Sequence, residues 1–310
     1  MGESIVKVQN LSHRYSVQWA IKDINFEIKQ KGVLGRLGSN GAGKSTPMNI
    51  MCGVLNQTEG DVYINDINLR EDPVGAKKHI GFLPQRPPLY SDFTVDEYLV
   101  YCAKLRLMDI REIRPAVERA KEKCAISHFS KRLIRNLSGG YQQRVGIAQA
   151  IVHNPMFVVL DEPTNGLDPN QIVEIRHLIK EIAVDRAVML STHILSEVQA
   201  ACNEIKMIEH GHLVFSGTIE DFNNYMAPST FIMTLENPPA MEELRAIPNV
   251  VEVEGLTTTR FRMHFTGDSE ITRRVAETSV RKGWRMSEII LERDSLDTVF
   301  AQLSGKKDRK

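Results

Sequence analysis

The chain has 310 residues, 42% of them hydrophobic and 25% charged, a composition typical of a globular protein with one large domain and one small one. Lysine plus arginine and aspartate plus glutamate each number 39, so no overall positive charge argues for binding to nucleic acid. The four cysteines lie far apart, which argues against a zinc site or a disulfide framework and leads us to expect a reducing cytoplasm.

No segment of the sequence predicts a membrane span. The longest apolar runs, such as residues 156–160, are far shorter than the ~20 residues that cross a bilayer. The N-terminus lacks a charged start followed by an apolar core, so we expect no signal peptide. If the protein works at a membrane, another chain has to supply the membrane part. The basic tail at residues 306–310 is expected to be a solvated end, with contact to an anionic membrane surface as the alternative.

Two kinds of strand are predicted in the first 220 residues. Segments with alternating or clustered apolar residues between turn signals predict a half-buried antiparallel sheet. These segments are residues 5–8, 24–28 and 61–64. Short apolar runs that end at loops predict buried parallel strands of an α/β core. These runs are residues 33–37, 80–83, 156–160 and 187–190.

Helix signals lie between these strands. Residues 94–151 are predicted to be mostly helical, and Thr94 with Glu97 forms a capping box that opens the first helix. Ser138 is expected to begin a further helix, which ends before Pro155. Asp168, followed by proline, is expected to cap a helix that runs to about residue 183.

The pattern changes beyond a polar stretch at residues 221–230, so we expect a domain at 1–220, a linker at 221–230 and an accessory domain at 231–310 with a basic tail. The accessory domain shows the order β-α-β-β-α-β, which predicts a small α+β module of the ferredoxin-like type with one added helix. Its strands are expected at 231–235, 250–253, 261–265 and 287–292, and its helices at 241–246, 271–281 and 296–303.

A glycine-rich loop follows the apolar strand at residues 33–37. It matches the pattern G-x-x-x-x-G-K-[ST], in which backbone N–H groups surround phosphate oxygens, the lysine reaches the β- and γ-phosphates, and the hydroxyl binds Mg²⁺. The loop predicts a nucleoside triphosphate site with a P-loop NTPase fold. Its residues are Gly38, Ser39, Asn40, Gly41, Ala42, Gly43, Lys44 and Ser45.

Further polar residues follow the other predicted parallel strands. Asp161 ends a buried strand, where a carboxylate can hold Mg²⁺ through water, and Glu162 follows it, where a carboxylate can orient the attacking water. Gln85 follows residues 80–83, and His193 follows residues 187–190, from which it can hold the γ-phosphate as a neutral donor. Taken singly, this glutamine and this histidine are also typical of surface or structural residues.

A second phosphate-binding helix start is predicted at Ser138, Gly139 and Gly140, where the bare glycines let a phosphate approach the backbone. An ordinary serine cap would explain Ser138 but not the two glycines and the polar turn after them. Two such helix starts on one chain suggest that two chains enclose ATP between them, and they argue against a P-loop kinase, which needs only one.

These motifs, in this order, resemble those of the ATP-binding subunit of an ABC transporter over about residues 1–220. The resemblance implies an ATPase with an antiparallel β subdomain, a helical subdomain, and two subunits that sandwich ATP and Mg²⁺ head to tail. It implies that Gly38 to Thr46 form the Walker A loop, with Ser45, Gln85 and Asp161 at the metal and Glu162, His193 and Gln85 in catalysis. It further implies that the signature Ser138, Gly139 and Gly140 and the D-loop Asp168 bind the nucleotide, and that Tyr15 stacks on adenine, unless it is a core tyrosine.

The resemblance also bears on partners. It implies a transmembrane permease on a separate chain, a location on the cytoplasmic inner face of the membrane, and a homodimer or heterodimer of ATP-binding subunits. The accessory domain is similar to the extension of subunits that serve ABC-2-type exporters. An ABC ATPase that acts on ribosomes or DNA is the alternative, but this chain has neither a second cassette nor a long coiled coil between its motifs.

Three residues depart from the family pattern. Pro47, just inside the P-loop helix, disfavours helical geometry at Thr46 and so is expected to weaken ATP binding. Arg36 stands at a strand position that is usually apolar, so we expect it to reach solvent or find a partner. Asp66 stands where a turn glycine is usual, at small expected cost because aspartate tolerates the left-handed region.

Overall fold

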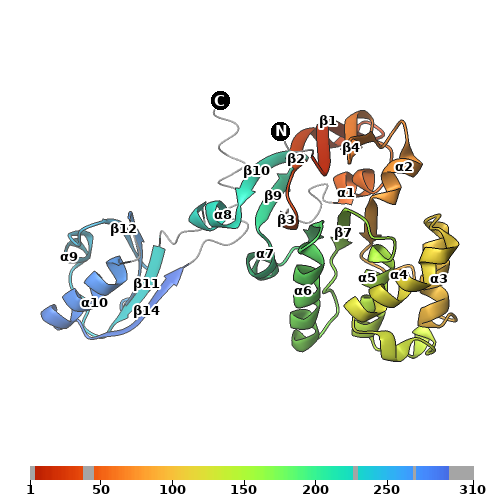
Figure 1. The fold of residues 1–310 in the computed structure, drawn as a ribbon. Coiled ribbons are helices and arrows are strands. Elements are labelled where there is room, and N and C mark those ends of the chain that lie inside the picture. The colour runs from red at the N-terminus through yellow and green to blue at the C-terminus, as the bar shows by residue number, and fades with distance from the viewer. Residues whose placement is uncertain (1–3, 38–44, 226–229, 268–269, 293–310) are drawn as a thin grey trace. The chain divides into compact units, whose positions relative to one another are not determined.

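The chain divides into two compact units, one from Met1 to Ile219 and the other beginning at Glu220. A computed structural model describes residues 4–37, 45–225, 230–267 and 270–292. Figure 1 labels the elements of both units. Helix α8 (Ile219–Tyr225) lies at the division, so part of the segment expected to be a linker is helical.

The larger unit contains a mainly parallel sheet, which within the described residues has six strands in the order β10-β9-β3-β8-β7-β6. Strands β9, β3, β8, β7 and β6 run parallel to one another, and β10 pairs with β9 in the antiparallel sense. The short apolar runs in the sequence correctly predicted four of the strands. The six are β3 (Gly32–Leu37), β6 (Ile80–Leu83), β7 (Phe157–Asp161), β8 (Ala187–Ser191), β9 (Glu204–Glu209) and β10 (His212–Thr218).

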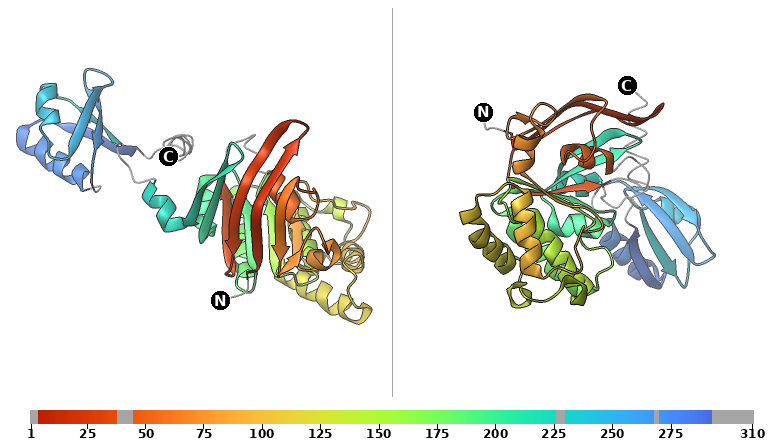
Figure 2. Two further views of the ribbon diagram at one scale, coloured as in Figure 1. Left: turned by 90° about the horizontal axis from the view of Figure 1, so that it is seen from above. Right: turned by 90° about the vertical axis from the view of Figure 1, so that its right-hand side faces the viewer.

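An antiparallel sheet forms a second layer, with strand order β2-β1-β4-β5 among the described residues. The expected half-buried sheet is confirmed, although its strands are longer than predicted, and Figure 2 shows the two long ones side by side. They are β1 (Val6–Tyr15), β2 (Gln18–Ile28), β4 (Glu59–Ile64) and β5 (Ile67–Asn68). Asn65 and Asp66 join β4 to β5 with positive φ angles of 49° and 60°, so Asp66 does take the left-handed conformation expected of it.

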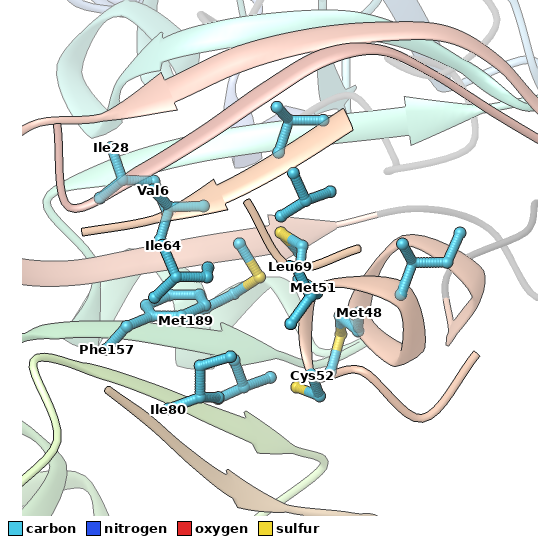
Figure 3. Packing of buried hydrophobic residues seen from close by; sticks show 14 of the residues in the cluster. Val6, Ile28, Met48, Met51, Cys52, Ile64, Leu69, Ile80, Phe157 and Met189 are labelled. Carbon is cyan, nitrogen blue, oxygen red and sulfur yellow. The ribbon is translucent and has the colours of Figure 1, made fainter. Parts of the chain in front are cut away.

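One hydrophobic core joins the two layers to helix α1 (Ser45–Met51). Figure 3 shows Met48 and Met51 of this helix in the same cluster as Ile64 of the antiparallel sheet and Met189 of the parallel sheet. All four side chains are at most 1% exposed. Because α1 packs on both sheets, the start of the helix is fixed at the edge of the parallel sheet.

The remaining helices of this unit cover the parallel sheet or form a helical region after β6. The capping box is confirmed: Glu97 N–H donates to Thr94 Oγ1 over 3.2 Å, and Thr94 N–H donates to Glu97 Oε2 over 2.8 Å. In the helical region the buried Lys121 ammonium pairs with the Asp96 carboxylate, which ties α4 to α3. These helices are α2 (Pro73–Lys78), α3 (Val95–Leu105), α4 (Ile110–Lys123), α5 (Gly139–Ile151), α6 (Pro169–Ala183) and α7 (Leu195–Ala201).

The smaller unit has its own core and shows the element order β-α-β-β-α-β that the sequence predicts, with strand order β12-β13-β11-β14. One face of its sheet buries Phe231, Met233, Met263 and Phe265 against helices that contribute Leu244 and Val275. Its elements are β11 (Thr230–Leu235), α9 (Met241–Arg245), β12 (Val250–Gly255), β13 (Arg260–Phe265), α10 (Ile271–Lys282) and β14 (Met286–Glu292). The helix expected at 296–303 lies outside the described residues.

Candidate functional site

The carboxyl ends of four neighbouring parallel strands, β3, β8, β7 and β6, carry the predicted motifs. The glycine-rich loop follows β3, His193 follows β8, Asp161 and Glu162 stand at the end of β7, and Gln85 follows β6. Parallel strands end at one edge of a sheet, so the ends of β3 and β7, which are far apart in the sequence, come to the same edge (Figure 1). The edge is therefore the candidate site.

The glycine-rich loop itself, from Gly38 to Lys44, lies outside the described residues. The described part begins with α1 at Ser45, as expected for a phosphate-binding loop that opens a helix. The helix includes Thr46, which is 5% exposed, although Pro47 follows it. Pro47 stands in the first turn, where a backbone N–H has no partner within the helix, so the proline costs the helix no hydrogen bond.

Glu162 and His193 are in direct contact. His193 Nδ1 lies 3.0 Å from both carboxylate oxygens of Glu162, so the Nδ1–H tautomer donates to this carboxylate. Glu162 has a φ of 48°, a left-handed conformation that is strained for a glutamate, and its N–H donates to Ser191 O over 2.9 Å. The His193 side chain is 52% exposed and that of Glu162 is 13% exposed, so the pair lies open to a ligand at the sheet edge.

Asp161 is half-buried at the end of β7 and pairs in register with Ser191 of β8. Arg36 of β3 pairs with the same serine from the other side, so Arg36, Ser191 and Asp161 form one row across the sheet. Residues in register on parallel strands direct their side chains to the same face. The row therefore places a guanidinium and a carboxylate on one side of the sheet.

Of the two outcomes expected for Arg36, the structure shows a partner and not contact with solvent, because the residue is 1% exposed. Its guanidinium Nη1 donates to Met48 Sδ over 3.3 Å, which gives Arg36 a contact with the P-loop helix. Burial lowers the pKa of Arg36 to about 9, and the negative charge of Asp161 opposes this change. The guanidinium thus finds its partners inside the core.

The Asp161 carboxylate at the edge suits Mg²⁺. A carboxylate is a hard ligand of the type that Mg²⁺ prefers, and this ion is commonly held by one or two carboxylates together with substrate phosphates. Within the described ranges no group of three or more histidine, cysteine or acidic side chains could hold a metal by itself. The donor set at Asp161 fits an ion that arrives with a nucleotide.

Tyr15 ends β1 beside the P-loop helix. Its hydroxyl lies 3.5 Å from Thr46 Oγ1, and its ring meets His13 edge to face at 4.7 Å. Tyr15 is 53% exposed, so it is no core tyrosine. An exposed aromatic face next to the phosphate-binding helix is free to stack on a base; this role of Tyr15 stays a prediction.

The second predicted phosphate-binding helix start is open to solvent. Ser138 is the N-cap residue of α5, but its side chain makes no capping hydrogen bond and is exposed. A Cβ on Gly139 would meet nothing within 4 Å in the described structure, whereas one on Gly140 would lie 2.8 Å from the Gln171 side chain. Gly139 therefore presents bare backbone outward, while a side chain at position 140 would need the Gln171 side chain of α6 to move.

Two further predicted site residues lie in loops. Asp168 caps α6, where its Oδ1 accepts from Gln171 N–H over 2.9 Å, so a cap is the contact that the structure gives it. Gln85 lies exposed in the loop after β6.

Among the described residues no helix is both long and apolar enough to cross a membrane.

Comparison with known proteins agrees with this geometry. The sequence profile of the family described as "ABC transporter" matches residues 21–165. The chain is 34% identical to the bacitracin transport ATP-binding protein BcrA of Bacillus licheniformis over 68% of this chain and 69% of the relative. It is 25% identical to the linearmycin resistance ATP-binding protein LnrL of Bacillus subtilis (strain 168) over 97% of this chain and 99% of the relative.

A solved structure extends the comparison. An ATP-binding cassette captured as a dimer in a post-hydrolysis state with ADP and phosphate matches the fold with a TM-score of 0.61 and 27% identity. The match covers 69% of this chain and 98% of that one. The predicted P-loop NTPase core is confirmed, and relatives named as transport proteins disfavour the alternative of an ATPase that acts on ribosomes or DNA.

Proposed function

The chain belongs to the family of ABC transporter ATP-binding proteins, and on that premise we propose that it hydrolyses ATP at a site shared by two such subunits. The observation that carries the proposal is the contact between Glu162 and His193 at the ends of the neighbouring strands β7 and β8, of which β8 lies next to the P-loop strand β3. Glu162 orients and activates the attacking water, and His193 holds the Glu162 carboxylate through its Nδ1–H. Gly38 to Thr46 bind the phosphates of the same nucleotide.

Mg²⁺ at this edge would be held by Ser45, by Gln85, and through water by Asp161. The ion would neutralise charge on the β- and γ-phosphates. This role of Asp161 is supported by its position at the end of β7, where it is half-buried and in register with Ser191. Tyr15 is proposed to stack on the adenine and Asp168 to contact the nucleotide across the subunit boundary.

The second half of each site is proposed to come from the partner subunit. Support comes from the open start of α5, where exposed Ser138 and Gly139 present backbone donors and a positive helix end. A phosphate bound there would belong to the nucleotide of the other subunit. ATP would close the two subunits, and hydrolysis would let them separate.

We further propose a transmembrane permease as partner, bound at the inner face of the cell membrane. The region after Gln85 has a cluster of aromatic rings that suits this contact: Tyr90 meets Phe93 at 5.4 Å and Tyr101 at 5.5 Å. Tyr90 is 52% exposed, and Tyr98 Oη donates to Pro88 O over 3.1 Å, which anchors the loop to α3. A rigid aromatic surface next to Gln85 can transmit motion between the nucleotide site and a partner.

Export is the proposed direction of transport. Two relatives, which are named for bacitracin transport and for linearmycin resistance, support this proposal. The match to the second spans nearly the full length of both chains, so it includes the smaller unit. We propose that residues 1–220 form the ATPase domain and that residues 231–310, after a linker at 221–230, form an accessory domain of the exporter group.

A complementation experiment tests the shared site. Ser138→Arg and Glu162→Gln chains should each lose ATP hydrolysis, the first because the arginine fills the space of the partner's γ-phosphate and the second because it lacks the catalytic carboxylate. In an equimolar mixture, mixed dimers contain one intact site, so about a quarter of wild-type activity should return. If the mixture stays inactive while each chain still binds ATP, Ser138 does not complete a site on a second copy of this chain.

A further inference from the structure

A buried carboxylate beside the candidate site joins its two catalytic loops. Glu197 of α7 is 4% exposed, and each of its two oxygens accepts a hydrogen bond from a threonine. Thr164 Oγ1 donates to Oε1 over 2.7 Å, and Thr192 Oγ1 donates to Oε2 over 2.9 Å. Thr164 is 7% exposed and Thr192 is fully buried, so water does not compete for these bonds.

The two threonines belong to the segments that carry the proposed catalytic pair. Thr164 stands two residues after Glu162, and Thr192 immediately precedes His193. The Thr192 hydroxyl also accepts from Ile194 N–H over 3.1 Å. This hydroxyl group therefore connects the residues that precede and follow His193 in the chain. One carboxylate thus connects the segment after β7 to the segment after β8.

The free-energy cost of burying the Glu197 carboxylate indicates that its hydrogen bonds do more than cap a short helix. A carboxylate that is removed from water is costly unless strong hydrogen bonds replace its hydration, and bonds to a charged acceptor are about twice as strong as neutral ones. Glu162 also keeps a left-handed backbone with a φ of 48°, a conformation that persists only when the surrounding structure fixes it. The Thr164–Glu197 bond lies two residues from that strained position and helps to fix it.

We propose that Glu197 is a positioning residue for ATP hydrolysis, which holds Glu162 and His193 in contact by binding Thr164 and Thr192 at once. The inference rests on the proposed roles of Glu162 and His193. Glu197 itself need touch neither nucleotide nor water. Its loss should let the two loops separate and should slow turnover, while the phosphate-binding residues, which belong to other segments, keep their affinity for ATP.

Isosteric variants test the proposal with little effect on folding. Thr164→Val and Thr192→Val each remove one hydroxyl and should lower kcat at least about 10-fold while the Kd for ATP changes less than about 2-fold, the scale for a small misplacement of catalytic groups. Because either change breaks the connection, the double variant should be hardly slower than the single ones. Glu197→Gln should keep most of the activity, since its carbonyl accepts from one threonine and its amide donates to the other.

Val198→Ala is the matched control. Val198 is the next residue of α7 and is fully buried, so the variant weakens the packing of the helix without touching either hydroxyl. It should lower Tm at least as much as the threonine variants do and leave kcat within about 2-fold, since it makes a small cavity away from the loops.

Two results would overturn the proposal: unchanged kcat in both valine variants, or a loss of kcat in Val198→Ala equal to theirs. Glu162→Gln, measured alongside, separates this failure from a failure of the proposed function. If Glu162→Gln hydrolyses ATP normally, the assignment of the catalytic carboxylate is wrong whatever the Glu197 network does.

Discussion

Replacement of Arg36 by methionine should stabilise the protein, because the native side chain buries a charge in the parallel sheet. Arg36 is 1% exposed, and burial lowers its pKa to about 9, well below the ordinary value for a guanidinium. A depression of that size corresponds to a net penalty of about 5 kcal/mol on the charged form, with the favourable charge of Asp161 already counted. The Met48 sulfur accepts a hydrogen bond from the guanidinium.

The net change in the free energy of unfolding depends on the volume that methionine keeps and on the charge that it removes. Methionine fills much of the same volume without the charge. Replacement of a whole buried ion pair by apolar residues is often stabilising by about 1–4 kcal/mol, and the Asp161 carboxylate that stays behind in this variant is only half-buried, so its loss of a partner costs less than that of a buried charge. We expect about 2 kcal/mol for Arg36→Met at pH 7. For a unit of this size that corresponds to a rise in Tm of about 4–8 °C.

The pH dependence gives a second signature. As pH rises, Arg36 loses its proton near pH 9 in the folded state but only at a much higher pH in the unfolded state. The unfolded state therefore binds more protons in this window, so the free energy of unfolding of the wild type rises with pH there. Arg36→Met lacks this rise.

Urea unfolding at pH 7 and pH 10 measures both effects, with Leu37→Met as the control because Leu37 is the next strand residue and is 1% exposed. The control should lose stability slightly, as conservative core substitutions do. An Arg36→Met chain that is less stable than the wild type at pH 7 would refute the reasoning. It would show that the guanidinium contributes more through its contacts than it costs by burial.

Three further predictions concern the nucleotide and the smaller unit. Pro47→Thr should tighten ATP binding several-fold, about 1 kcal/mol, in a titration of both versions, and equal Kd values would mean that the first turn absorbs the proline. Tyr15→Ala should weaken ATP binding by about 1–3 kcal/mol, the scale of base stacking, with no change in Tm, and an unaltered Kd would exclude stacking. Deletion of residues 230–310 should leave a soluble chain that binds ATP, because each unit has its own core, and an insoluble product would contradict this.

The sequence predicted the edge of the parallel sheet well, for a physical reason. A parallel strand covered on both faces must be apolar, so runs such as residues 157–161 and 187–191 stand out, and the polar residue that ends each run marks the edge. The contact between Glu162 and His193 follows from that topology.

We did not predict the hairpin of β9 and β10, because β9 contains charged residues that are typical of an exposed segment. β9 contains Lys206 and Glu209, which are 7% and 5% exposed, so a strand buried by its neighbours has the sequence of an exposed one. Lys206 is accommodated because its ammonium donates to Ser216 Oγ over 2.7 Å across the hairpin. The turn at His210 and Gly211, where both φ angles are positive, was a local signal for the hairpin, but the burial of these charged residues depends on tertiary structure.

The role of Glu197 was missed for the same reason. Its two partners stand 33 and 5 positions away, and only the packing of α7 brings them to one carboxylate. Glu197 stands four residues after His193, and this spacing was the one local signal. Because α7 has only seven residues, the spacing could not predict the contacts of Glu197. The glycine-rich loop from Gly38 to Lys44 stays a prediction from its motif.

Glu162→Gln provides the most direct test of the central claim, that ATP is hydrolysed at this edge of the sheet between two subunits. The amide keeps the shape of the side chain but cannot act as a base, so ATP should bind with nearly unchanged Kd while turnover falls at least about 100-fold. At saturating ATP and Mg²⁺ the variant should elute as a stable dimer in size-exclusion chromatography, and without nucleotide as a monomer. Normal turnover, or a monomer with ATP bound, would contradict the account.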